Sequence, residues 1–192
     1  YAQQVNSVFG RAGVSWKNMA FVDATFRNDW FSTLSKADRS YLYPSVSASF
    51  VISELLPQTK GWLDMLRLRG SWSNSPTPPG IYAINSSYSI SAATWGALNG
   101  AGVPSSLYMP NYVPEKFDNY ETGLQALFLK NRVSFDVTYY SRRYHDRLKY
   151  VGLTAASGYT SIYQNWKEET TRRGWELMLN GTPLKNKDWQ LD

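Results

Sequence analysis

Residues able to do acid–base or metal chemistry are few in this chain. The single histidine, His145, stands among Arg142, Arg143, Asp146 and Arg147, a setting typical of a solvated loop. No histidine metal site or hydrolase triad can be assembled around it without partners from elsewhere. Cysteine is absent, so disulfides and thiolate metal sites are excluded.

One pair of carboxylates, Glu168 and Glu169, has the residue types of a glycosidase. Such an enzyme needs two carboxyl groups that converge across the substrate at about 5 to 9.5 Å, whereas consecutive residues on a strand point to opposite faces. We therefore predict no catalytic residue, no cofactor and no metal site, and a protein that is not an enzyme.

Residue types suited to ligand binding concentrate in the segment 74–116. After a proline-rich turn region at 75–80, aromatic side chains stand among Ser, Asn and Gly: Tyr82, Tyr88, Trp95, Tyr108 and Tyr112. Aromatic rings stack on the apolar faces of sugar rings or peptide units, while hydroxyls and amides bind their polar edges. These residues are candidates for substrate contact. The alternative is a loop that packs on itself or on a partner.

The elements that must position these residues are strands, because apolar residues recur with a period of two. Strands are expected at 5–16, 19–28, 42–52, 65–73, 119–128, 133–144 and within 163–182, with an eighth beginning near Asp188. One face of these strands is apolar and includes Val46, Phe50, Leu68, Leu124, Phe135, Val137, Trp175, Leu177 and Leu179. The other face carries Arg67, Arg69, Glu121 and Asp136.

An apolar face opposite a charged face is typical of a transmembrane β-barrel with lipid outside and water inside. No apolar run approaches the roughly 18 residues of a membrane helix, so insertion would have to be as a barrel. Compact connections at 17–18, 54–63, 129–131 and 183–187 alternate with long ones at 29–40, 74–116 and 145–161, as short and long loops do on the two rims of such barrels. A soluble β-sandwich carbohydrate-binding module is the alternative, since its strands alternate in the same way.

Charge gives no sign of nucleic-acid binding. The chain has 20 Lys and Arg against 15 Asp and Glu, a formal charge of +5, and the basic residues are scattered rather than gathered into a tract.

Five segments of the chain, 42–54, 66–74, 114–124, 131–140 and 173–183, resemble the late barrel of SusC/RagA-type TonB-dependent transporters of Bacteroidota. The resemblance implies an all-β antiparallel fold, with 1–192 forming about eight strands of a barrel of roughly 22 strands, and 74–116 a long extracellular loop. It implies uptake of an oligosaccharide or peptide across the outer membrane, a SusD-like lipoprotein as lid, and TonB acting on an internal plug. We expect the chain to be an internal piece of the longer protein.

The resemblance also implies roles for the two faces. The apolar residues would meet lipid, and Arg67, Arg69, Glu121 and Asp136 would line the lumen and touch substrate. Facing charges that pair across neighbouring strands are the alternative.

Overall fold

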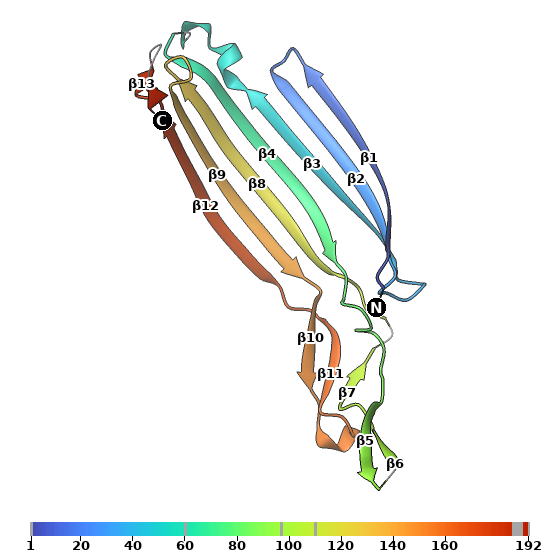
Figure 1. Cartoon of the computed structure of the whole chain (residues 1–192). Coiled ribbons are helices and arrows are strands. Elements are labelled where there is room, and N and C mark those ends of the chain that lie inside the picture. Colours follow the sequence, from blue (N-terminus) through green and yellow to red (C-terminus); the bar gives the residue numbers. More distant parts are fainter. Residues whose placement is uncertain (1, 60, 97, 110, 186–189, 192) are drawn as a thin grey trace.

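The main body of the protein is an open, antiparallel sheet of seven strands. The computed structural model describes residues 2–59, 61–96, 98–109, 111–185 and 190–191. The strand order is β1-β2-β3-β4-β8-β9-β12, so β1 and β12 are the edges of this sheet (Figure 1). The strands are β1 (Val5–Trp16), β2 (Ala20–Phe31), β3 (Ser40–Val51), β4 (Leu63–Thr77), β8 (Glu115–Phe128), β9 (Val133–His145) and β12 (Thr170–Gly181).

The predicted all-β antiparallel class is confirmed, and each strand expected up to residue 144 is present in this sheet. Several strands are longer than expected: β2 reaches Phe31, β4 reaches Thr77, and β8 begins at Glu115. The connection expected at 29–40 is therefore reduced to 32–39. The period-two pattern is lost in these extensions, but pairing with a neighbouring strand continues through them and satisfies the backbone groups.

Tight turns join the strands at one end of the sheet. Lys17 and Asn18 have φ values of 48° and 54°, the left-handed conformation of a two-residue hairpin turn. Leu129, Lys130 and Asn131 are also left-handed, and the Asn131 N–H donates to Asp64 Oδ2 at 2.8 Å. The connection between β3 and β4 at this end contains two short 3₁₀ helices, η1 (Ile52–Leu55) and η2 (Pro57–Thr59). This connection, 52–62, is longer than the one at 32–39 at the opposite end, so the predicted alternation of compact and long connections holds only in part.

The long connections gather at the opposite end of the sheet, as Figure 1 shows, and contain structure of their own. A three-stranded sheet joins β10 (Arg147–Gly152), β11 (Ser161–Trp166) and β7 (Ser106–Tyr108), with β7 and β11 parallel. A hairpin is formed by β5 (Ser89–Trp95) and β6 (Leu98–Gly102), and η3 (Ala155–Ser157) is a single 3₁₀ turn. We call this part, residues 78–114 and 146–169, the loop layer.

The loop layer corrects two expectations. The connection predicted at 145–161 contains β10, and His145 is the last residue of β9 rather than a loop residue. The strand predicted within 163–182 is present as β12 in the main sheet, and β11, which precedes it, belongs to the three-stranded sheet. The apolar pattern is interrupted between them, since residues 167–173 contain no apolar side chain.

A small core holds the loop layer to the main sheet. Phe31, Leu34 and Tyr112 are buried together, and Tyr41 and Tyr163 pack against them. The start predicted for an eighth strand, near Asp188, lies outside the described residues, and short strands β13 (Leu184–Lys185) and β14 (Gln190–Leu191) pair on either side of it. No helix of the described residues is both long enough and apolar enough to cross a bilayer.

Candidate functional site

The apolar positions of the main sheet lie in rows that cross it. The register pairs Phe50 with Leu68, Leu68 with Leu124, Leu124 with Val137 and Val137 with Leu177. Because directly paired residues point to the same side, these side chains form one continuous apolar row. Leu177 is 72% exposed, and no described element covers this face. All residues predicted to face the membrane share it: Val46, Phe50, Leu68, Leu124, Phe135, Val137, Trp175, Leu177 and Leu179.

Aromatic residues stand at the two ends of this apolar face. Toward the loop layer, the rings of Tyr139 and Trp175 lie 4.9 Å apart, one row away from Tyr120. At the tight-turn end, Trp62 stacks on Phe128 with ring centroids 6.0 Å apart. From Phe128 to Tyr120 the strand runs about 26 Å at about 3.3 Å per residue. At a strand tilt of about 40° this spans about 20 Å, near the height of the apolar band of an outer-membrane barrel.

The opposite, polar face carries charges in cross-strand contacts. The Arg69 guanidinium donates to Asp136 Oδ1 at 2.7 Å and to Thr138 Oγ1 at 2.6 Å. Arg67 donates to Ser49 Oγ at 3.0 Å. A shallow depression of about 290 Å³ is lined by three of the four predicted residues, Arg67, Arg69 and Glu121, whereas Asp136 takes part through its ion pair. Arg69 and Asp136 therefore form the cross-strand ion pair that was the alternative to substrate contact.

Gly123 provides the space for this ion pair. Arg69 lies on β4 and Asp136 on β9, and β8 runs between them. A Cβ atom at Gly123 would lie 2.6 Å from Arg69 Nε, so the arginine side chain crosses directly over the glycine. Tyr140 covers Gly174 in the same way. Long side chains therefore lie along the polar face instead of projecting from it.

A row of like charges lies toward the loop layer on the polar face. Arg142 pairs directly with Arg172 in the register. The Arg142 Nε–H donates to Asn119 Oδ1 at 3.2 Å, and the Arg172 guanidinium lies 5.5 Å from the centre of the Tyr144 ring. A depression of about 300 Å³ adjoins this row and is lined by Glu121, Thr138, Tyr140, Arg142, Tyr144, Arg172 and Glu176. The sequence analysis missed the row because only the register brings the two arginines together.

Two of the predicted loop aromatics are structural parts of the loop layer. Tyr112 is 1% exposed; its hydroxyl donates to the Tyr163 carbonyl at 2.6 Å and accepts the Met109 N–H at 2.9 Å, and burial raises its pKa. Tyr108 pairs with Tyr163, and Tyr163 with Tyr150, in one row of the three-stranded sheet. Burial also raises the pKa of Tyr163, and the hydrogen bond with Tyr108 contributes most to raising the pKa of Tyr150 to about 12.

Two of the remaining predicted aromatics, Tyr82 and Tyr88, are exposed in the loop layer. Tyr82 is 58% and Tyr88 is 70% exposed. Trp95 ends β5, and its side chain lies outside the described part of the chain. The whole stretch from Gly70 to Pro114 contains no Asp, Glu, Lys, Arg or His, so the exposed surface of this part of the loop layer is uncharged.

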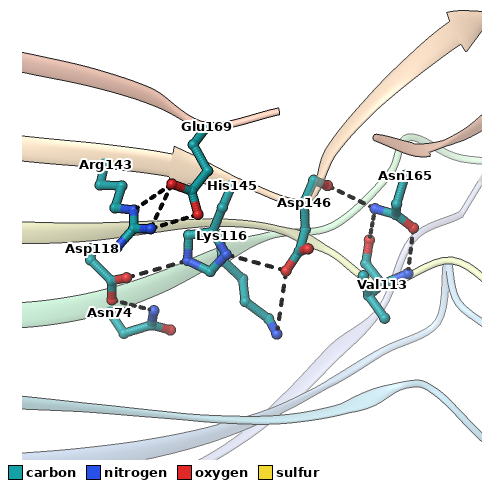
Figure 2. A network of polar contacts seen from close by, with 9 residues as sticks. All are labelled: Asn74, Val113, Lys116, Asp118, Arg143, His145, Asp146, Asn165 and Glu169. Atoms are coloured by element: carbon teal, nitrogen blue, oxygen red, sulfur yellow. Dashed lines mark hydrogen bonds and ion pairs between the residues drawn. The ribbon is translucent and has the colours of Figure 1, made fainter. Parts of the chain in front are cut away.

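A polar network joins the loop layer to the ends of β8 and β9 (Figure 2). His145 is half-buried between two carboxylates, with Nδ1 at 3.2 Å from Asp146 and Nε2 at 3.3 Å from Asp118. Lys116 Nζ lies 3.8 Å from the same oxygen of Asp146. The solvated loop position expected for His145 is therefore wrong, because the strand continues to this residue. The Asn165 amide adds three hydrogen bonds, to the Asp146 carbonyl and to both backbone groups of Val113.

The two neighbouring glutamates serve different contacts. Glu169 accepts from Arg143 Nη2 at 2.6 and 2.5 Å through its two oxygens, and Glu168 is hydrogen-bonded by Lys149. The contact with Lys149 lowers the pKa of Glu168. Each carboxylate thus has its own cationic partner, Lys149 for Glu168 and Arg143 for Glu169. Among the described residues, no group of three or more potential metal ligands is arranged to hold an ion.

Comparison with known proteins identifies the sheet. The family model for the TonB-dependent receptor-like β-barrel matches residues 1–192. The chain belongs to this family. It is 29% identical to TonB-dependent receptor P26 of Formosa agariphila, over 97% of this chain and 19% of that protein. The predicted membership is confirmed, and an open sheet with one uncovered apolar face does not fit the β-sandwich alternative.

Solved structures give the same result. The RagAB peptide transporter superimposes with a TM-score of 0.84 at 30% identity, over 98% of this chain and 21% of that chain. RagAB in the closed-closed state gives a TM-score of 0.83 at 30% identity, over 97% of this chain and 20% of the RagAB chain. The siderophore receptor PirA of Pseudomonas aeruginosa shares the fold, with a TM-score of 0.62 at 13% identity, over 98% of this chain and 32% of that chain. This chain spans about a fifth of the length of P26 and the RagAB chains.

Proposed function

We propose that this chain forms part of the wall of a TonB-dependent transporter that takes up an oligosaccharide or a peptide across the bacterial outer membrane. The division of the main sheet into an apolar and a charged face carries the proposal. Leaving apolar surface in water costs about 25 cal/mol per Å², so lipid is the environment that suits the uncovered face. The charged face would border the water-filled lumen. The wall then supplies the channel and its selectivity, and TonB supplies the force.

The proposal assigns residues 1–192 to one barrel domain and 74–116 to an extracellular loop. A SusD-like lipoprotein would cover the loop layer, and TonB would act on a plug inside the barrel. The likeness to the peptide importer RagAB supports both a peptide substrate and a partner above the barrel. The uncharged, aromatic surface around Tyr82 and Tyr88 supports an oligosaccharide equally, because sugar rings stack on aromatic planes.

The assignment of the two faces can be tested with spin labels on β12. The chain has no cysteine, so a single label can be placed in this segment of the full-length transporter through Leu177→Cys or Glu176→Cys. These neighbours point to opposite faces. We expect the label at 177 to be relaxed by oxygen, which partitions into lipid, and the label at 176 by a water-soluble nickel complex. Equal or reversed accessibilities would refute the assignment.

Transport itself is tested by uptake of fluorescent oligosaccharides and peptides into cells with and without the full-length gene. Uptake should require both the transporter and TonB. Uptake that continues without TonB would contradict the proposed mechanism.

A further inference from the structure

The strongest unexplained feature of the polar face is the direct pairing of Arg142 with Arg172. Like charges at directly opposite positions of two strands repel each other and destabilise the sheet. Two other arginines of this face have carboxylate partners: Arg11 pairs with Asp23 at 2.7 Å and Arg69 with Asp136 at 2.7 Å. Arg67 donates to the Ser49 hydroxyl instead, but no second arginine stands directly opposite it. Within the described residues, neither Arg142 nor Arg172 has a carboxylate at ion-pair distance.

The nearby glutamates do not neutralise the two arginines. Glu121 accepts a hydrogen bond from Asn119 Nδ2 at 2.7 Å, and the oxygen of the same amide accepts from Arg142. Asn119 therefore stands between the two charges. Glu176 is four residues from Arg172 on β12, about 13 Å along the strand. The depression of about 300 Å³ consequently has a basic end at the arginines and an acidic end at Glu176.

Aromatic rings hold both guanidinium groups in place. Arg172 lies over the Tyr144 ring at 5.5 Å and Arg142 over the Phe117 ring at 5.6 Å. Phe117 and Tyr144 are themselves paired in the register, with ring centroids 5.8 Å apart. Such contacts leave the N–H groups of an arginine free to bind an anion while restricting its motion. The two donors are thus oriented before any ligand arrives.

We infer that Arg142 and Arg172 form a binding site for a carboxylate group of the transported molecule. Guanidinium groups bind carboxylates through paired, charge-assisted hydrogen bonds, and one carboxylate between the two arginines would remove their repulsion. The site lies at the end of the polar face next to the loop layer, where a substrate entering from outside would arrive first. The inference rests on the proposed function, because it requires the charged face to border the substrate path.

Two substrate classes could supply the carboxylate: a peptide through its C-terminus, and an acidic oligosaccharide through a uronic acid. We would measure binding to the full-length transporter, purified in detergent with its partner, using two matched pairs of probes. One pair is an oligoalanine peptide with a free or an amidated C-terminus. The other is an oligogalacturonate and its methyl ester. Preference for the acid within one pair identifies the source of the carboxylate.

The variants are Arg142→Gln and Arg172→Gln, with Arg143→Gln as the matched control. Arg143 is the next residue on β9, points to the other face and pairs with Glu169. We expect wild type and Arg143→Gln to prefer an acid probe, and each of the two other variants to lose about tenfold in affinity for it. Affinity for the amidated or esterified probe, which lacks the carboxylate, should not change. Added salt should weaken binding of the acid probe alone.

A second readout separates binding from structure. Removing one of two opposed positive charges should leave the melting temperature of the unliganded transporter unchanged or raise it. The inference is overturned if the wild type shows no preference for either acid, or if Arg142→Gln and Arg172→Gln bind the acid as the wild type does. A lower melting temperature with unchanged affinity would likewise show a purely structural role. Wild-type cells that take up no oligosaccharide or peptide would instead count against the proposed function.

Discussion

Replacing Gly123 by alanine tests whether the charged side chains lie along the wall. The new Cβ would be 2.6 Å from Arg69 Nε and 3.1 Å from Thr138 Oγ1. Arg69 would have to leave this position and break its bonds to Asp136 and Thr138, which are 2.7 and 2.6 Å long. We therefore expect Gly123→Ala to destabilise the barrel through Arg69.

The magnitude follows from the exposure of the ion pair. A hydrogen bond to a charged group contributes about 1.5 to 3 kcal/mol when buried, but the Arg69 and Asp136 side chains are 41% and 21% exposed, and solvent screening lowers this value. We expect a coupling of about 1 to 2 kcal/mol between positions 69 and 123. The removal of a strand glycine offsets part of the loss, by about 0.5 to 1 kcal/mol.

The assay is a double-mutant cycle, with guanidinium-induced unfolding of the full-length transporter in detergent followed by tryptophan fluorescence. Gly123→Ala is measured in the wild type and in Arg69→Ala. The contact of the new Cβ with the Val137 carbonyl, at 3.1 Å, is present in both backgrounds and cancels. Gly70→Ala is the control, since its Cβ would meet only the Glu121 carbonyl at an ordinary 3.8 Å. An equal effect of Gly123→Ala in both backgrounds would refute the placement of Arg69.

Three further predictions concern the apolar face and the loop layer. Leu177→Arg or Val137→Arg should each impair barrel stability by about 2 to 4 kcal/mol if the site is near the bilayer midplane, and unchanged unfolding in lipid in both variants would remove the lipid-facing assignment. The Lys149 contact lowers the pKa of Glu168. The ion pair therefore stabilises the loop layer above the ordinary pKa of a glutamate, and this stabilisation is lost as the pH falls through the lowered pKa of Glu168. Hydrogen-exchange protection of β10 and β11, corrected for intrinsic rates, should then decrease between about pH 5 and pH 3, but not in Lys149→Met. Tyr112→Phe should cost about 1 to 2 kcal/mol in local opening of the loop layer, since two backbone partners lose their hydrogen bond. Hydrogen exchange at the wild-type rate would contradict this.

The faces of the main sheet were predictable from the sequence for a simple physical reason. Side chains alternate sides along a strand, so the assignments of Leu68 and Arg69 to opposite faces needed no knowledge of their neighbours. Short turns then restrict which strands are adjacent. The register of β4, β8 and β9 aligns the predicted apolar residues in common rows, because any shift by one residue would turn each strand's apolar side to the wrong face.

The contacts between distant residues were not predictable in this way. The parallel pairing of β7 with β11 joins Tyr108 to Tyr163 across more than fifty residues, and no local pattern specifies it. Tyr112 was a candidate for substrate contact, with packing of the loop on itself as the alternative, and the structure buries it with Phe31 and Leu34. His145 was expected in solvent, although its alternation with Arg143 along β9 continued the strand. The opposition of Arg142 and Arg172 depends on the register between β9 and β12, which the alternation within each strand does not specify.

Under the proposed function, the distribution of charge would divide substrate recognition between two surfaces. Along the rim, charges such as those of Arg143 and Glu169 neutralise each other and fix the loop layer to the sheet. Beyond the rim, the segment from Gly70 to Pro114 has no charged residue, so contacts made there depend on shape, stacking and neutral hydrogen bonds. Within the described wall, Arg142 and Arg172 stand directly opposite each other without a carboxylate partner. Discrimination by charge would therefore occur at the wall, after a first contact at the loop layer that is insensitive to charge.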